Sequence, residues 1–174
     1  MKISGYEKAR QEWYGDILLE LNEIQIFCSL QELRKLKSFL EHARKEHSSV
    51  EKLEHFHSHY CLWDKEWEWT EDSQDLVIYT AEGPMKISGY EKSKEESISY
   101  AIDTGTSLEL AEATIVCSLE ELRKIESFME YALEKLSLTR EFADSHIRYS
   151  LWNKNWSEES SDLVIFTKEE ALSN

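Results

Sequence analysis

Three histidines and a cysteine alternate along one short stretch, and these residue types could bind a metal ion or transfer protons. In a strand every second side chain shares a face, and here that face carries His55, His57, His59, Cys61 and Trp63. Imidazole and thiolate groups are common zinc ligands. Successive side chains on one face of a flat strand stand about 7 Å apart, too far to close a tetrahedron without another segment.

The corresponding stretch in the second half of the chain does not carry the same residue types. Its alternating positions hold Asp144, His146, Arg148, Ser150 and Trp152, which cannot form an equivalent metal site. We therefore expect no bound metal and no other cofactor, and we interpret both faces as polar surfaces of a sheet.

Two histidines, His57 and His146, occupy equivalent positions in the two halves. With a carboxylate such as Asp64 nearby, a histidine could act as a general base, because imidazole titrates near neutral pH. No nucleophile elbow, glycine-rich phosphate loop or pair of carboxylates at fixed spacing accompanies them. We predict that the chain is not an enzyme; a histidine-dependent hydrolase or a metal-binding protein is the alternative.

Tryptophans set among acidic residues give the best indication of a binding surface. The segment 63–72 reads WDKEWEWTED, and the segment 152–159 reads WNKNWSEE. Tryptophan is enriched at binding hot spots, and acidic neighbours select a basic partner. The same tryptophans could instead seal the two halves against each other. The residues predicted to contact a partner are Trp63, Asp64, Trp67, Trp69, His57, His59, His146, Arg148, Trp152 and Trp156.

The elements that position these residues occur twice in the chain. Residues 1–8 recur unchanged as 85–92, and residues 28–35 recur nearly unchanged as 117–124. The single proline, Pro84, stands just before the second copy in a Gly-Pro pair that is typical of a turn or linker. We therefore divide the chain into a first repeat, 1–84, and a second repeat, 85–174, fused head to tail.

Each repeat predicts the order ββαββ. An apolar run ends at Cys28 or Cys117, a serine follows, and a glutamate three residues later completes the capping-box signature of a helix start. Apolar residues then recur at helical spacing, and apolar strands follow at 75–80 and 162–167. We expect an α+β fold of two tandem units, each a mainly antiparallel sheet with one amphipathic helix packed on one face. Five extra residues in the second repeat predict a longer hairpin that turns at 103–105.

The chain is acidic, with a formal net charge of −15 at pH 7, and both repeats share the excess of carboxylates. Nucleic-acid binding requires a cationic face, and Lys and Arg are nowhere dense enough to form one. An acidic surface repels nucleic acids and membranes and attracts basic proteins. We therefore expect a basic protein partner and neither a nucleic acid nor a membrane.

The sequence shows no segment that would direct the chain to a membrane or across one. No apolar run approaches the roughly 18 residues of a membrane span, and residues 1–5 have no apolar signal segment, so we expect a cytoplasmic protein. The three cysteines, Cys28, Cys61 and Cys117, are odd in number and favour reduced thiols over a disulfide framework.

The order of these motifs resembles the small α+β immunity proteins of bacterial polymorphic toxin systems. The resemblance is carried by an LEL segment, a strand that runs into CSLEELRK, a helix, and then DSHIRYSLW and SDLVIFT. It implies a non-enzymatic inhibitor that binds a toxin stoichiometrically, such as a nuclease with a cationic active site. Immunity proteins of this kind are generally single units, so the tandem repeat is a departure. The alternative is a self-associating module whose units or chains pair through open sheet faces.

Overall fold

The order of elements is the same in the two halves of the chain. The computed structural model describes residues 1–13, 16–49, 57–66, 73–91, 108–138 and 146–167. The first half contains β1 (Lys2–Trp13), β2 (Asp16–Cys28), α1 (Leu30–Ser48), β3 (His57–His59), α2 (Tyr60–Trp63) and β4 (Asp75–Thr80). The second contains β5 (Lys86–Glu91), β6 (Leu108–Cys117), α3 (Leu119–Leu138), β7 (His146–Arg148), α4 (Tyr149–Trp152) and β8 (Asp162–Thr167). The predicted α+β class is confirmed.

The two long helices begin where the sequence predicts. The Ser29 hydroxyl accepts a hydrogen bond from the Glu32 amide at 3.2 Å, and the Glu32 carboxylate accepts one from the Ser29 amide at 2.7 Å, which completes a capping box. In the second half the Ser118 hydroxyl accepts from the Glu121 amide at 3.1 Å. Each serine therefore ends a strand and starts a helix.

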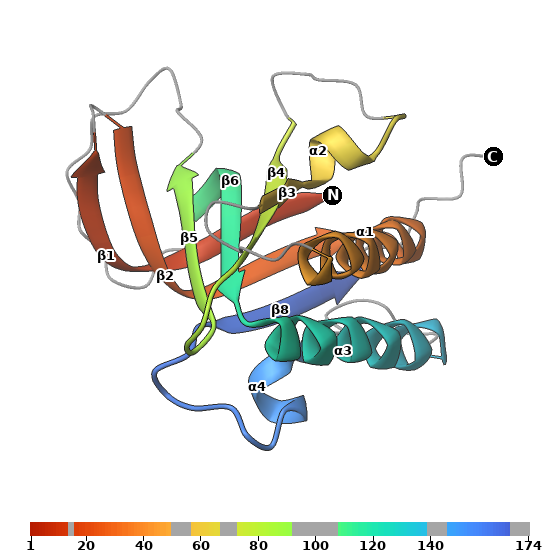
Figure 1. Cartoon of the computed structure of the whole chain (residues 1–174). Helices are drawn as coiled ribbons and strands as arrows, with labels where there is room; N and C mark the ends of the chain where they lie inside the picture. Colours follow the sequence, from red (N-terminus) through yellow and green to blue (C-terminus); the bar gives the residue numbers. More distant parts are fainter. Residues whose placement is uncertain (14–15, 50–56, 67–72, 92–107, 139–145, 168–174) are drawn as a thin grey trace.

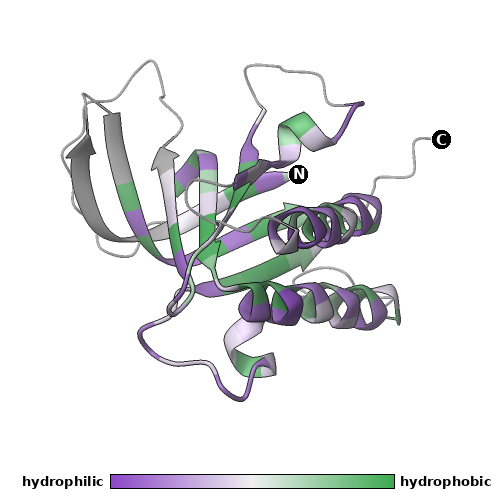
Figure 2. Cartoon of the chain, viewed as in Figure 1, coloured by the Kyte–Doolittle hydropathy of each residue, from purple (hydrophilic) through white to green (hydrophobic). Residues whose placement is uncertain are grey.

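Helices α1 and α3 lie side by side next to the sheet (Figure 1). Hydrophilic and hydrophobic residues alternate along both helices (Figure 2), and an ion pair of 2.6 Å between Arg44 and Glu126 joins them. The apolar stripes predicted from the sequence are buried. The buried residues of the helices are Leu33, Leu36, Phe39, Leu40, Ala43 and His47 in α1, and Leu122, Ile125, Phe128, Met129, Ala132 and Leu136 in α3.

The last strand of each half pairs with the other half. Strand β4 runs parallel to β6, with Asp75 opposite Glu112, and β8 runs parallel to β2, with Asp162 opposite Glu23. All the described strands therefore belong to one mixed eight-stranded sheet. The predicted arrangement of two tandem, mainly antiparallel ββαββ units is not confirmed. Because β4 and β8 are nearly identical in sequence, strand periodicity alone could not distinguish pairing within a half from pairing between halves.

Strand β2 changes neighbours along its length. Its first part, Leu18–Leu21, pairs with β5, whereas its second part, Glu23–Cys28, pairs with β8. The register between β1 and β2 shifts beside Asn22, as at a β-bulge. The shift also moves the buried positions of β2 from Leu19 and Leu21 to Ile24 and Ile26.

A single hydrophobic cluster draws residues from both repeats. It places Ile3 and Ile78 of the first repeat together with Ile87 and Ile165 of the second. The sequence boundary between residues 84 and 85 therefore divides two repeats that share a core and a sheet. The longer hairpin expected within residues 97–107 lies outside the described residues. In the described part of the chain, neither long helix carries an apolar run that could cross a membrane.

One local prediction is wrong. The stretches 60–63 and 149–152 were expected to continue strands, but each forms one helical turn, α2 or α4. Cys61 and Trp63 therefore do not share an extended strand face with His57 and His59. The preceding strands, β3 and β7, contain only three residues each.

Candidate functional site

The short helices α2 and α4 present the most exposed large apolar side chains in the described residues. Leu62 in α2 is 76% exposed, and Leu151 in the equivalent position of α4 is 82% exposed. Helix α2 lies beside α1 and α4 beside α3, at opposite ends of the view in Figure 1. We call residues 62–66 the α2 surface and residues 151–155 the α4 surface.

Aromatic packing holds the α2 surface in place. Trp63 is half-buried, and its ring centroid lies 5.8 Å from that of Phe39 and 5.9 Å from that of Tyr60. Trp152 packs in the same way on Phe128 and Tyr149, at 5.8 Å from each ring. Both predicted tryptophans therefore anchor a short helix to a long one while part of each ring stays exposed.

The α2 surface carries two carboxylates. Lys35 of α1 forms ion pairs with Asp64 at 3.0 Å and with Glu66 at 3.1 Å. The Asp64 side chain is largely covered by this contact, but the Glu66 side chain is 84% exposed. The exposed Lys65 lies on the same surface, so Lys35 and Lys65 together balance these two carboxylates.

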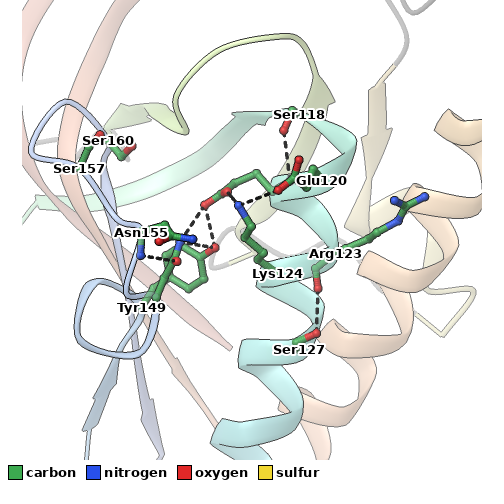
Figure 3. A network of polar contacts seen from close by, with 11 residues as sticks. Ser118, Glu120, Arg123, Lys124, Ser127, Tyr149, Asn155, Ser157 and Ser160 are labelled. Atoms are coloured by element: carbon green, nitrogen blue, oxygen red, sulfur yellow. Dashed lines mark hydrogen bonds and ion pairs between the residues drawn. The ribbon is translucent and has the colours of Figure 1, made fainter.

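The α4 surface occupies the equivalent place in the second half but carries different charges. Asn153 stands where the first half has Asp64, and its amide donates to the Tyr149 hydroxyl at 3.1 Å. That hydroxyl donates to Glu121 at 2.7 Å, and Lys124 contacts Glu121 at 3.2 Å (Figure 3). Burial raises the pKa of the Tyr149 hydroxyl, so it remains a donor. This network fixes α4 to α3 and leaves no acidic cluster beside Leu151 among the described residues.

Of the other predicted tryptophans, the structure describes Trp156, which lies outside the two surfaces as defined. Trp156 is half-buried against the core, and its indole N–H donates to the Ser161 carbonyl at 3.4 Å. Trp67 and Trp69 lie outside the described residues. The exposed leucines Leu62 and Leu151 were missed as site residues, although each stands directly before a predicted tryptophan.

The predicted histidines and the arginine lie at the sheet edges. His57 is exposed, and its ring lies 5.0 Å from that of His59. His146 is also exposed and stacks on Phe166 at 5.1 Å. His59 and Arg148 occupy equivalent positions directly before α2 and α4, where each contacts an aspartate that begins a strand.

In the first half this contact is a histidine, cysteine and aspartate cluster. His59 Nδ1 lies 2.6 Å from Asp75 Oδ2, and the Cys61 thiol donates to the same oxygen at 3.2 Å. Burial, together with the hydrogen bond to Asp75 and its charge, raises the pKa of Cys61 to about 12. The thiol is therefore protonated at neutral pH, which argues against a cysteine nucleophile.

In the second half the contact is an ion-pair network. Arg148 donates to Asp162 at 2.9 Å and also to Glu23. The Ser150 hydroxyl donates to Asp162 at 2.7 Å. Sequence reasoning missed Asp75 and Asp162, although both precede the repeated LVI segment and could have been recognised as equivalent.

The fold and these surfaces define a pseudosymmetric α+β protein with two related but chemically different ends. No family model matches the chain, and no curated protein or solved structure matches it either.

Proposed function

We propose that this chain is a non-enzymatic binding protein whose α2 surface engages a basic protein partner. The observation that carries the proposal is Leu62, which is 76% exposed on a helix that aromatic packing holds in place. An exposed apolar side chain on a rigid element is available for burial at low entropic cost. Glu66 and the half-buried Trp63 flank it and add charge and aromatic area.

Charge favours a basic partner. The net charge of −15 creates a long-range negative potential, which accelerates encounters with cationic proteins and disfavours nucleic acids. Binding should therefore weaken as the salt concentration rises, because surface charges are screened over about 8–10 Å near physiological ionic strength. Truncation of the apolar contacts should mainly increase the dissociation rate.

The specific form of this proposal is an immunity protein that covers the cationic active site of a toxin such as a nuclease. It is supported by the sequence resemblance, by the net negative charge of the chain and by the two carboxylates of the α2 surface, which the α4 surface lacks. The difference between the α2 and α4 surfaces favours one toxin bound at the α2 end, rather than two equivalent binding events.

A second candidate function is self-association, and Leu151 is the observation that favours it. This leucine is 82% exposed on the α4 surface, where Asn153 and Asn155 replace the two acids of the first half. A surface with little like-charge repulsion could pair with a second copy of the chain. Light scattering of the intact chain and a Leu151→Ser variant would detect such pairing.

The test is affinity capture from a lysate of the source organism at low and high salt. Baits are the intact chain, a Leu62→Ser variant, and a Leu138→Ser variant as matched control, because Leu138 is 72% exposed at the end of α3. We expect the intact chain and the Leu138→Ser control to capture a basic protein that high salt releases. The Leu62→Ser variant should capture at least tenfold less of it.

The captured protein is then assayed with and without the chain. Loss of its activity at a 1:1 ratio would support the immunity form. If no basic protein distinguishes Leu62→Ser from Leu138→Ser, the α2 surface is not the binding site and the proposal fails.

A further inference from the structure

The cluster beside α2 brings together three types of metal ligand. His59 Nδ1, Cys61 Sγ and a carboxylate oxygen of Asp75 all lie within 4.8 Å of one another. Two segments supply them, the β3–α2 junction and the first residue of β4. The helical turn that starts at Tyr60 removes the spacing problem of a flat strand, because Cys61 no longer stands one strand repeat away from His59.

The carboxylate at the centre of the cluster is already oriented. Asp75 Oδ1 accepts hydrogen bonds from the backbone amides of Cys61 and Leu76, each at 2.9 Å. These bonds leave Oδ2 facing His59 and Cys61, at 2.6 Å and 3.2 Å. Backbone contacts of this kind act as an outer shell that holds a metal-ligating carboxylate in one orientation.

The second half shows the same scaffold without metal ligands. Asp162 Oδ1 accepts from the amides of Ser150 and Leu163 at 2.8 Å and 2.9 Å, as Asp75 does at the equivalent positions. Its Oδ2 is occupied by Arg148 and the Ser150 hydroxyl. The first half differs by histidine in place of arginine and cysteine in place of serine, and both exchanges introduce zinc-ligating groups.

The charge balance also differs between the two clusters. Glu23 and Glu112 are equivalent residues, each opposite the clustered aspartate on the neighbouring strand. Glu23 accepts a hydrogen bond from Arg148. Among the described residues Glu112 has no hydrogen-bond or ion-pair partner, so the first cluster contains two carboxylates and no arginine. A divalent cation would supply the positive charge that Arg148 supplies in the second half.

We propose that His59, Cys61 and Asp75 bind a zinc ion through Nδ1, Sγ and Oδ2, with a fourth position open beside Glu112. Zn–N and Zn–O bonds of about 2.0–2.1 Å and Zn–S bonds of about 2.3 Å place tetrahedral ligands roughly 3.3–3.6 Å apart. The two contacts to Asp75 need to widen by only about 1 Å or less to reach this range. The ion would join α2 to β4, and this inference is independent of the proposed partner.

The test uses the reduced, chelator-treated full chain and Co²⁺ as a spectroscopic probe, with Zn²⁺ in competition. We expect one Co²⁺ per chain, a thiolate-to-cobalt charge-transfer band in the near ultraviolet, and displacement by Zn²⁺. The double variant His59→Arg/Cys61→Ser reproduces the side chains of the second half. It should lose the band and at least about 100-fold in affinity, since even loss of an outer-shell partner costs about 10- to 100-fold.

Two further variants keep the result decisive. Cys61→Ser alone should lose the band even if the double variant is poorly folded. His57→Gln, which removes the exposed neighbouring histidine, should keep the affinity within about twofold. A chain without the band, a band that survives Cys61→Ser, or equal losses in His57→Gln and the double variant would overturn the site.

Discussion

Some equivalent core positions of the two repeats hold polar residues in the first half and apolar residues in the second. In the first half His47 is fully buried, with one ring nitrogen against Ser58 at 3.0 Å and the other against Thr80. In the second half Leu136 and Ile147 stand at the positions of His47 and Ser58. The hydroxyl of Thr167, the equivalent of Thr80, is then buried without a hydrogen-bond partner among the described residues.

This difference predicts an acid-sensitive element in the first half. Burial lowers the pKa of the His47 imidazole from its ordinary value of 6.5, so the folded chain holds it neutral and the unfolded chain protonates first. The stability that the neutral ring contributes is complete above pH 6.5 and falls as the pH decreases below it. Urea unfolding at pH 7.5 and 5.5 should show this loss.

The matched variant is His47→Leu/Ser58→Ile, which copies the second half. Its unfolding free energy should depend less on pH over the same interval than that of the intact chain. An equal pH dependence in both proteins would assign the acid sensitivity to other groups, such as the many carboxylates of the surface.

At the scale of the elements, two buried polar side chains link strands of one half to strands of the other. The Gln74 side chain accepts from the Ile3 amide at 2.6 Å and donates to the Leu110 carbonyl at 2.5 Å. Ser161 has the equivalent role, since its hydroxyl accepts from the Ile87 amide at 3.1 Å and donates to the Leu21 carbonyl at 2.7 Å. Each side chain thus bridges the first strand of its own half and the second strand of the other.

Replacing Gln74 by Ala should therefore destabilise the chain. The change leaves buried backbone groups of Ile3 and Leu110 unsatisfied, and each such group costs about 1–3 kcal/mol. Urea denaturation should show a loss of that size, with the exposed Gln31→Ala in α1 as control. A loss no larger than that of the control would mean that water replaces the side chain.

Neighbouring strands come so close at Gly5 and Gly89 that the size of the side chain there is restricted. A Cβ added at Gly89 would lie 2.6 Å from the Glu112 carbonyl oxygen, whereas at the equivalent Gly5 it would lie 3.0 Å from that of Glu23. We expect Gly89→Ala to destabilise the chain by about 1–3 kcal/mol, as overpacking does in other proteins.

The internal comparison is Gly5→Ala, which should cost less than Gly89→Ala when both are measured by thermal or urea unfolding. The reverse order would show that the strands around Gly89 can separate more easily than those around Gly5.

At the scale of the whole molecule, the last strand of each half pairs with the second strand of the other half. β4 pairs with β6, and β8 pairs with β2, over six residues in each ladder. The helices α1 and α3 pack on each other, and the core is continuous between the halves. This is the arrangement of an intertwined pair joined covalently at Pro84.

Separately produced fragments 1–84 and 85–174 should therefore fold together when mixed. Size-exclusion chromatography with light scattering should show a 1:1 complex, and the mixture should unfold cooperatively. Each fragment alone should be poorly folded or paired with itself, because its last strand loses the parallel neighbour that the other half supplies. A monomeric 1–84 fragment as stable as the intact chain would contradict the shared sheet.

The sequence by itself determined the local elements. The serine caps at Ser29 and Ser118, the helical stripes and the repeated LVI strands depend on backbone satisfaction and burial within a few residues, so pattern alone predicts them. The same reasoning failed at 60–63, because a single helical turn has too few residues to establish a period that differs from that of a strand.

Only the tertiary structure decided which segments meet. Two nearly identical strands, β4 and β8, can pair with β2 or β6 at similar local energy, and the choice depends on long-range packing that periodicity does not encode. The cluster of His59, Cys61 and Asp75 has a more local cause, because β3 pairs with β4 and α2 follows β3 directly. The equivalence of Asp75 and Asp162 was visible in the repeat, and their contacts with His59 and Arg148 form within one half, where β3 pairs with β4 and β7 with β8. Only the folding of the halves on each other brings Glu112 and Glu23 opposite these aspartates.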